Sequence, residues 1–302
     1  MAANEPLDRR RFLKSAGVAV GVAAAAGVMA GCGADEEASG AAPAAEAESV
    51  PGGFGNIINE IRDRGKITIA TILKFPPEMY RDPVTNEPAG YDVEIMKMIA
   101  QDLEVELDLV DVEWEAILPG VAAGKYDTTL CGIVNKPSRL LTYEFTRGYV
   151  PYDQWLLVRA DEPAATWHDL NQPGKKITAQ IGASAEYRAR DAFPEAEIVP
   201  LKVPEVMLEV EAGRADACLI EIYLAMPFAS KHPNTKVLGY PDEAAGLLAR
   251  EWGCIPVRKD EHSFLHYLDA WIGWYWERGT LPAMYDAIVG PTLRGEVSWE
   301  EG

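Results

Sequence analysis

The spacing of hydrophobic and polar residues becomes regular from residue 66 and predicts strands and helices in turn. Apolar residues crowd positions 67–72, which is typical of a buried strand. Residues 90–103 then carry Ile95, Met98, Ile99 and Leu103 at helical spacing, and residues 104–109 alternate as a half-exposed strand does. Strand–helix–strand order predicts a parallel sheet with helices packed on it.

The same order of elements returns later in the chain. Residues 128–134 read as a further strand of the first unit, and the second unit is expected to contain strands at 176–180, 197–201 and 217–220 with helices at 185–193 and 204–212. A last long helix is expected at 261–278, because Gly279 and Pro282 follow it. The pattern therefore predicts two α/β units.

The first 55 residues have the pattern of an export signal followed by a flexible tether. A basic stretch, Asp8 to Lys14, precedes an apolar run at about 16–31, which is shorter than the ~20 residues of a membrane-spanning helix and is typical of a secretory signal. The basic stretch resembles a twin-arginine export signal, and Met29-Ala30-Gly31-Cys32 resembles a lipobox, where Cys32 receives lipid. We therefore expect a signal peptide at 1–31, a flexible tether at 32–55, export to the periplasm or cell surface, and attachment to the membrane through lipid.

Charge and cysteine content narrow the choice of partners. With 28 basic and 47 acidic residues the net charge is −19, which excludes a nucleic-acid partner because phosphate binding needs clustered cations. The chain has four cysteines, and no pair has C-x-x-C spacing. If lipid takes Cys32, an odd number of thiols remains, so Cys131, Cys218 and Cys254 are expected to be small core residues.

Several motifs resemble one protein family. Gly90-Tyr91-Asp92-Val93-Glu94-Ile95, with Ile99, Ala100 and Leu103, resembles the signature of the bacterial extracellular solute-binding proteins, family 3. The resemblance covers about residues 65–289. Five further segments match in the family's order: Lys74 to Pro77, Gly132 to Arg139, Gly182 to Ser184, Gly213 to Ala217 with Glu221 beyond, and Trp252 to Ile255.

The resemblance implies an α/β fold of the two-lobed periplasmic-binding-protein type II, with two crossover strands. Lobe 1 would comprise 56–150 plus 251–295, and lobe 2 would comprise 151–250. A small ligand would bind between the lobes.

The resemblance also assigns roles to side chains. Arg139 would hold a ligand carboxylate, because a guanidinium makes two parallel bonds to it. Glu221 stands where the family usually has an Asp that receives the ligand's ammonium, and Ala183 and Ser184 would offer donors at a helix start. Phe75 and Trp114 would pack on the ligand side chain. A surface Arg139, a solvated Glu221, a plain capping Ser184 and a core Trp114 are the structural alternatives.

The segment around Arg139 departs from the family at two positions. Val134 and Lys136 stand where relatives often carry hydroxyl residues, which leaves backbone N–H groups at Gly132 and Lys136 as the donors. Ile72 stands where relatives that bind cationic side chains often carry Asp. The ligand side chain is therefore expected to be neutral, apolar or aromatic.

The resemblance implies a binding protein that delivers an amino acid or related carboxylate to the permease of an ABC importer, without catalytic residues, metal or cofactor. His262 and His266 lack the Glu of an H-E-x-x-H zinc site. The alternative is an enzyme on the same scaffold, because the chain also resembles cyclohexadienyl dehydratases near Trp114 and at 170–174. A receptor's sensing domain is a third reading, disfavoured because no signalling segment follows.

Overall fold

The computed structural model describes residues 56–297, so the expected signal peptide, the tether and Cys32 lie outside the described residues. Within this range no helix has the length and apolarity needed to cross a bilayer.

A three-stranded parallel sheet organises the first α/β group. Its central strand β1 (Lys66–Thr71) pairs with β5 (Glu106–Asp111) and β6 (Thr128–Thr129). Helix α2 (Tyr91–Asp102) buries its apolar face at Ile95, Met96 and Ile99, as the helical spacing predicts. The group also contains α1 (Ile57–Asp63), α3 (Trp114–Ala122), α9 (His262–Glu277) and α10 (Thr280–Ile288).

A seven-stranded mixed sheet organises the second group. The strands follow the order β10-β9-β11-β8-β13-β7, and β12 pairs with β8. Helices α5 (Ser184–Ala192) and α6 (Glu205–Glu211) follow β9 and β10 in the chain and pack on β9. The strands are β7 (Ile133–Val134), β8 (Tyr143–Arg159), β9 (Lys176–Gln180), β10 (Glu197–Leu201), β11 (Ala217–Glu221), β12 (Thr235–Val237) and β13 (Leu247–Arg258).

The remaining elements are short or peripheral. A small antiparallel sheet joins β2, β3 and β4 before α2, and α11 packs on α7. These elements are β2 (Lys74–Phe75), β3 (Met79–Arg81), β4 (Pro88–Ala89), α4 (Pro137–Leu140), a 3-10 turn at Trp167–Leu170, α7 (Ile222–Lys231), α8 (Glu243–Gly246) and α11 (Gly290–Leu293).

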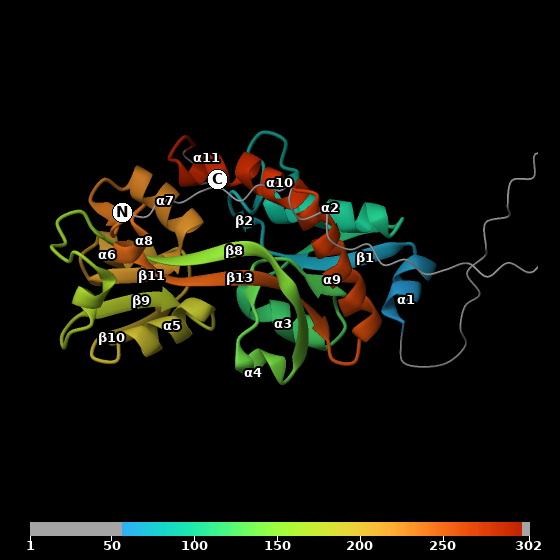
Figure 1. Cartoon of the computed structure of the whole chain (residues 1–302), viewed down its shortest axis with the longest axis horizontal. Helices are drawn as coiled ribbons and strands as arrows, with labels where there is room; N and C mark the ends of the chain where they lie inside the picture. The colour runs from blue at the N-terminus through green and yellow to red at the C-terminus, as the bar shows by residue number, and fades with distance from the viewer. Residues whose placement is uncertain (1–55, 298–302) are drawn as a thin grey trace, which may run out of the picture. The chain divides into compact units, whose positions relative to one another are not determined.

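The long strands β8 and β13 belong to both groups. They pair antiparallel from Tyr143 to Trp155, and Figure 1 shows them side by side from the β1 group to the β9 group. One hydrophobic core surrounds β1 and takes in β8 up to Tyr152, while two others cover the faces of the β9 sheet and take in β8 from Leu156 onward. Between Tyr152 and Leu156, β8 therefore leaves one hydrophobic core and enters the next.

Most predicted elements agree with the structure to within one or two residues at each end. The strand predicted at 128–134 is wrong in one respect, because β6 and β7 are separate strands in different sheets. Gly132 lies between them with φ of +60°, in the left-handed region that interrupts a strand. The three described cysteines are buried and unpaired, as expected for small core residues.

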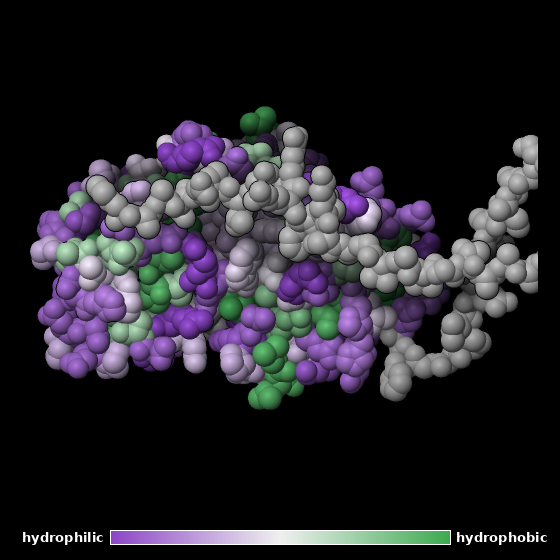
Figure 2. Space-filling model, viewed as in Figure 1, coloured by the Kyte–Doolittle hydropathy of each residue, from purple (hydrophilic) through white to green (hydrophobic). Residues whose placement is uncertain are grey.

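Figure 2 shows a mostly hydrophilic face, in keeping with the high content of charged residues. A hydrophobic patch lies over α4, where Leu141 is 83% exposed.

Candidate ligand-binding site

A small cavity lies where the strand ends of the two groups meet. Glu221 ends β11, Gln180 ends β9 and Ile72 follows β1, so three carboxyl ends of parallel strands contribute to its wall. Open α/β sheets place their ligands at this edge. The cavity is lined by Ile72, Phe75, Met79, Trp114, Cys131, Gly132, Val134, Arg139, Tyr152, Gln180, Ala183, Ser184, Glu221, Tyr223 and Leu224.

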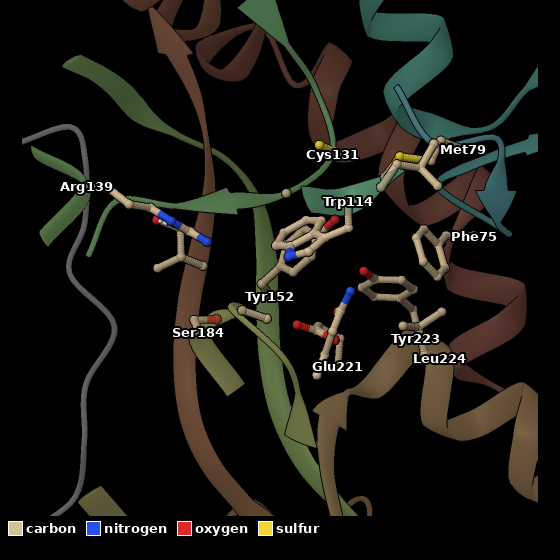
Figure 3. Close-up of a pocket in the computed structure, with 15 residues that line it drawn as sticks. Phe75, Met79, Trp114, Cys131, Arg139, Tyr152, Ser184, Glu221, Tyr223 and Leu224 are labelled. Carbon is tan, nitrogen blue, oxygen red and sulfur yellow. Dashed lines mark hydrogen bonds between the residues drawn. The ribbon is translucent and has the colours of Figure 1, made fainter. Parts of the chain in front are cut away.

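The two ends of the cavity differ in chemistry. Figure 3 shows Arg139 and Ser184 toward one side, Phe75, Met79, Tyr223 and Leu224 toward the other, and Trp114, Tyr152 and Glu221 between them. The cavity encloses about 30 Å³, which holds about a water molecule or two. An amino acid therefore needs the walls to move apart before it can enter.

Arg139 is a buried cation whose hydrogen bonds go to backbone carbonyls. The side chain is 8% exposed, and its Nη1 and Nη2 donate to the oxygens of Val134 at 2.8 Å and Gly182 at 3.1 Å. Burial lowers the pKa of the guanidinium, and no ion pair among residues 56–297 includes it. A buried charge without a counter-ion is costly, so the site favours an anion beside Arg139.

Glu221 is the matching buried anion. Its Oε1 accepts a 2.9 Å hydrogen bond from Nε2 of Gln154, the residue opposite it on β8. Burial raises the pKa of the carboxyl, and no described basic side chain forms an ion pair with it. A cation in the cavity would reverse that shift by favouring the ionised form.

The turn before α5 lies between these charges and is partly occupied. The Gly182 carbonyl accepts from Arg139 and, at 3.4 Å, from Lys136 Nζ. The Gly182 N–H donates to Glu186 at 2.8 Å, so this N–H is not free for a ligand. Ser184, the first residue of α5, is 6% exposed and lines the cavity with Ala183.

The structure brings together all but one of the residues singled out in the sequence. Seven of them line the cavity, and they are Arg139, Glu221, Ser184, Ala183, Phe75, Trp114 and Gly132. Lys136 does not line it, because its side chain extends to the Gly182 carbonyl and its N–H donates to the oxygen of Val134 at 3.0 Å. The backbone donor expected at Lys136 is therefore already used.

Sequence reasoning missed a layer of polar residues behind the cavity wall. Tyr152 and Tyr223 line the cavity with their rings 5.3 Å apart, and the Tyr152 hydroxyl donates to the buried carboxylate of Glu78. Asp92 lies beside this group, and its backbone N–H donates to the Glu78 carbonyl at 2.9 Å. An acid directly after Pro76-Pro77 was the only signal of Glu78 in the sequence.

Gly132 gives Tyr152 its place in the wall. A Cβ at residue 132 would lie 1.8 Å from the Tyr152 ring, and φ of +60° disfavours any side chain there. Absence of a side chain at residue 132 therefore lets the ring reach the cavity.

A second, larger groove adjoins the cavity. Its volume is about 510 Å³, and Trp114 and Arg139 line both spaces. Lys202 and Glu115 both line the groove and form a 3.0 Å ion pair. Trp114 and Arg139 thus separate the small cavity from the larger opening.

A cavity between α/β groups that share two long strands is the arrangement of the two-lobed solute-binding proteins. The model of the bacterial extracellular solute-binding proteins, family 3, matches residues 67–291, and the chain belongs to this family. Like the other members, it is a solute-binding protein, and its fold is the two-lobed periplasmic-binding-protein type II.

Curated relatives and solved structures agree with this assignment. The chain is 22% identical over 198 residues to the arginine-binding extracellular protein ArtP of Bacillus subtilis, covering 65% of this chain and 75% of that protein. It is 24% identical over 216 residues to the glutamine-binding protein of Geobacillus stearothermophilus, covering 70% of this chain and 81% of that protein. The crystal structure of an ancestral amino-acid-binding protein, a precursor of cyclohexadienyl dehydratase, is similar with a TM-score of 0.67 at 25% identity, covering 77% of this chain and 99% of that one.

Proposed function

We propose that this protein captures an amino acid, or a closely related small carboxylate, and delivers it to the permease of an ABC importer. One observation carries the proposal: Arg139 and Glu221 are buried, oppositely charged, without ion-pair partners among the described residues, and line the same cavity. An α-amino acid carries the complementary carboxylate and ammonium. The relatives that bind arginine and glutamine support this ligand class.

Capture requires the cleft to open and close. We propose that residues 56–150 plus 251–295 form lobe 1, that residues 151–250 form lobe 2, and that they hinge about β8 and β13. Contacts between the proposed lobes include the Arg139–Gly182 bond and the Lys202–Glu115 pair, and they hold the cavity at its small volume. The Lys202–Glu115 pair is largely exposed and is worth at most about 1 kcal/mol, so breaking this pair adds little to the cost of opening.

The test combines ligand identification with closure. Small molecules released from protein purified under native conditions are identified by mass spectrometry, and stripped protein is titrated with amino and keto acids by calorimetry. We expect at least one α-amino acid to bind at about micromolar Kd or tighter, and X-ray scattering to show compaction on saturation. If amino acids and keto acids all fail to bind, the proposed function is wrong.

An enzyme is the second candidate, and one property of Glu221 favours it. A buried carboxyl with a raised pKa beside an anion-binding Arg is suited to donate a proton to a leaving group. A cyclohexadienyl dehydratase-like reaction would convert prephenate into phenylpyruvate, with loss of carbon dioxide and of the protonated hydroxyl as water. Turnover of prephenate that disappears in Glu221→Gln would establish this activity; binding without turnover would reject it.

Anchoring is proposed from the sequence alone, on the twin arginines and Met29-Ala30-Gly31-Cys32. We expect the mature protein to begin at Cys32, to carry the added mass of lipid, and to sediment with membranes. Cys32→Ala should release it into the soluble exported fraction, and Cys254→Ala, at a buried thiol, serves as the matched control. Membrane attachment that persists in Cys32→Ala would exclude lipidation at this residue.

A further inference from the structure

Glu78 is a buried acid without a cationic partner at the end of the cavity opposite Arg139. Its side chain is fully buried, and no ion pair among residues 56–297 includes it. Its Oε2 accepts from the Tyr152 hydroxyl, while its Oε1 has no hydrogen-bond partner. The neighbouring Met79 lines the cavity, so Glu78 lies one residue behind the wall.

Tyr152 and Tyr223 lie between Glu78 and the cavity, and their hydroxyls determine which ligand groups can form hydrogen bonds at this end. A phenol has one proton, and Tyr152 donates that proton to Glu78. The nearby Tyr223 hydroxyl also lowers the pKa of Glu78 and so favours its ionised form. Oxygens whose protons are committed in this way can only accept, so this end of the cavity favours a ligand group rich in N–H donors.

The surroundings of Glu78 disfavour its ionised form as long as no cation is bound beside it. Burial raises the pKa of Glu78 well above its usual range, and Asp92 and Glu221 raise it further by repulsion. The charged and titratable groups that interact with Glu78 come from several elements, and they are Tyr91 and Asp92 on α2, Cys131 before β7, Tyr149 and Tyr152 on β8, Glu221 on β11, Tyr223 on α7 and Tyr285 on α10. A cation bound here would favour the ionised form of Glu78, and it can stack on Phe75 or Trp114, both of which line the cavity.

We propose that Glu78, acting through the hydroxyls of Tyr152 and Tyr223, makes the cavity select α-amino acids whose side chain ends in a guanidinium or ammonium group. The inference rests on the proposed function and specifies its ligand class. It replaces the neutral side chain expected from Ile72, because the acid that is missing at residue 72 is present at residue 78. Arg139 and Glu221 bind the two α-substituents, and Glu78 is a positioning residue for the tyrosines at the other end.

Arginine and citrulline provide the decisive comparison, because they have nearly the same shape and differ in the charge of the terminal group. Calorimetry of the wild-type protein should give a preference for arginine of about tenfold or more, the range expected for hydrogen bonds to a charged group. Lysine against norleucine repeats the comparison for an ammonium. Stronger binding of citrulline or norleucine than of the cations would overturn the proposal and leave amino-acid binding intact. If no amino acid binds, the proposed function itself fails.

Glu78→Gln should reduce the preference for arginine over citrulline to within about threefold, with most of the loss on arginine. Glu162→Gln is the matched control, because Glu162 is also a buried acid but is paired with Lys175 away from the cavity. Tyr152→Phe removes only the hydroxyl and keeps the test available if Glu78→Gln does not fold. An unchanged preference in a folded Glu78→Gln or Tyr152→Phe protein would refute the proposal.

Proton release distinguishes this role from a structural one. A cation near Glu78 lowers the pKa of its carboxyl, so arginine binding should release protons at pH values below the raised pKa and should strengthen as the pH rises. Calorimetry in two buffers of different ionisation enthalpy counts these protons. We expect release with arginine, less with citrulline, and a smaller difference between the two ligands in Glu78→Gln. Equal release with both ligands in the wild-type protein would contradict a cation beside Glu78.

Discussion

Arg139→Ala is expected to weaken binding of a carboxylate ligand by about 30-fold or more. The guanidinium is buried and has no anionic partner among the described residues, so a bound carboxylate would be its counter-ion in a site that excludes water. Removing one member of such a pair leaves the other buried and unmatched, which costs on the order of 2–5 kcal/mol. Calorimetry with the ligand identified from the native protein measures this loss directly.

Companion variants separate the contributions at this end of the cavity. Arg139→Lys keeps the charge but loses the planar fork, so it should recover only part of the affinity. Arg214→Ala removes an exposed arginine paired with Glu209 and should bind as the wild type does. Glu221→Gln should lose affinity only if the ligand carries an α-ammonium. Wild-type affinity in Arg139→Ala would show that the carboxylate binds elsewhere.

The spacing of apolar residues in the sequence was sufficient to predict the helices and strands that have one buried face. The helix predicted at 90–103 is α2, because Ile95 and Ile99 recur on the face that packs into the core. The strands predicted at 176–180 and 197–201 match β9 and β10. These predictions depend on the local spacing of apolar residues, which depends little on the rest of the fold.

Periodicity missed the elements whose environment changes along their length. Strand β8 passes from one hydrophobic core to another within 17 residues, and β13 accompanies it with several register shifts. Neither environment lasts long enough to set a single alternating pattern, so Tyr152 and Gln154 could not be placed at the site. Pairing between β8 and β11 is a long-range contact that places Gln154 opposite Glu221.

The candidate site was partly predictable for a related reason. Glu221 and Ser184 are adjacent to strands that the sequence revealed, and their positions at carboxyl ends indicate a ligand site. Glu78 lies in the loop before α2, and its fully buried position depends on the Tyr91 and Asp92 N–H groups bonding to the Pro77 and Glu78 carbonyls. No local spacing encodes that contact. Our proposal of a cationic ligand side chain therefore depends on Glu78, a residue only six positions from Ile72.

The pair of buried acids has a consequence for stability that is independent of any ligand. Asp92 is fully buried, and both of its carboxyl oxygens lack a hydrogen-bond partner. Burial raises the pKa of Asp92 from 3.8 to about 7. Between these two values the folded protein holds a proton that the unfolded chain releases. This contribution is therefore fully present below about pH 4 and is lost as the pH rises through 7.

Asp92→Asn is expected to abolish this loss, because an amide does not ionise. A pKa difference of about three units corresponds to on the order of 4 kcal/mol at 1.36 kcal/mol per unit, so the variant should be more stable than the wild type by several kcal/mol at pH 8. The difference should shrink toward zero near pH 4. The same substitution removes the repulsion that Asp92 exerts on Glu78, so the pKa of Glu78 should fall as well. Urea unfolding at a series of pH values gives the free energy of unfolding of the wild type and of Asp92→Asn as a function of pH. Subtracting one from the other cancels the titration of the exposed carboxylates, which both proteins share.

Asp63→Asn, at an exposed aspartate, should run parallel to the wild type across this range. A difference between Asp92→Asn and wild type that stays constant from pH 4 to pH 8 would show that Asp92 is ionised in the folded protein, and hence that a cation neutralises it. In that case a monovalent salt titration at about pH 5.5, below the raised pKa of Asp92, should raise the stability of the wild type and leave Asp92→Asn unchanged. If Asp92 is instead protonated, salt should act on both proteins alike, because the neutral acid in the folded core offers no charge for a cation to meet.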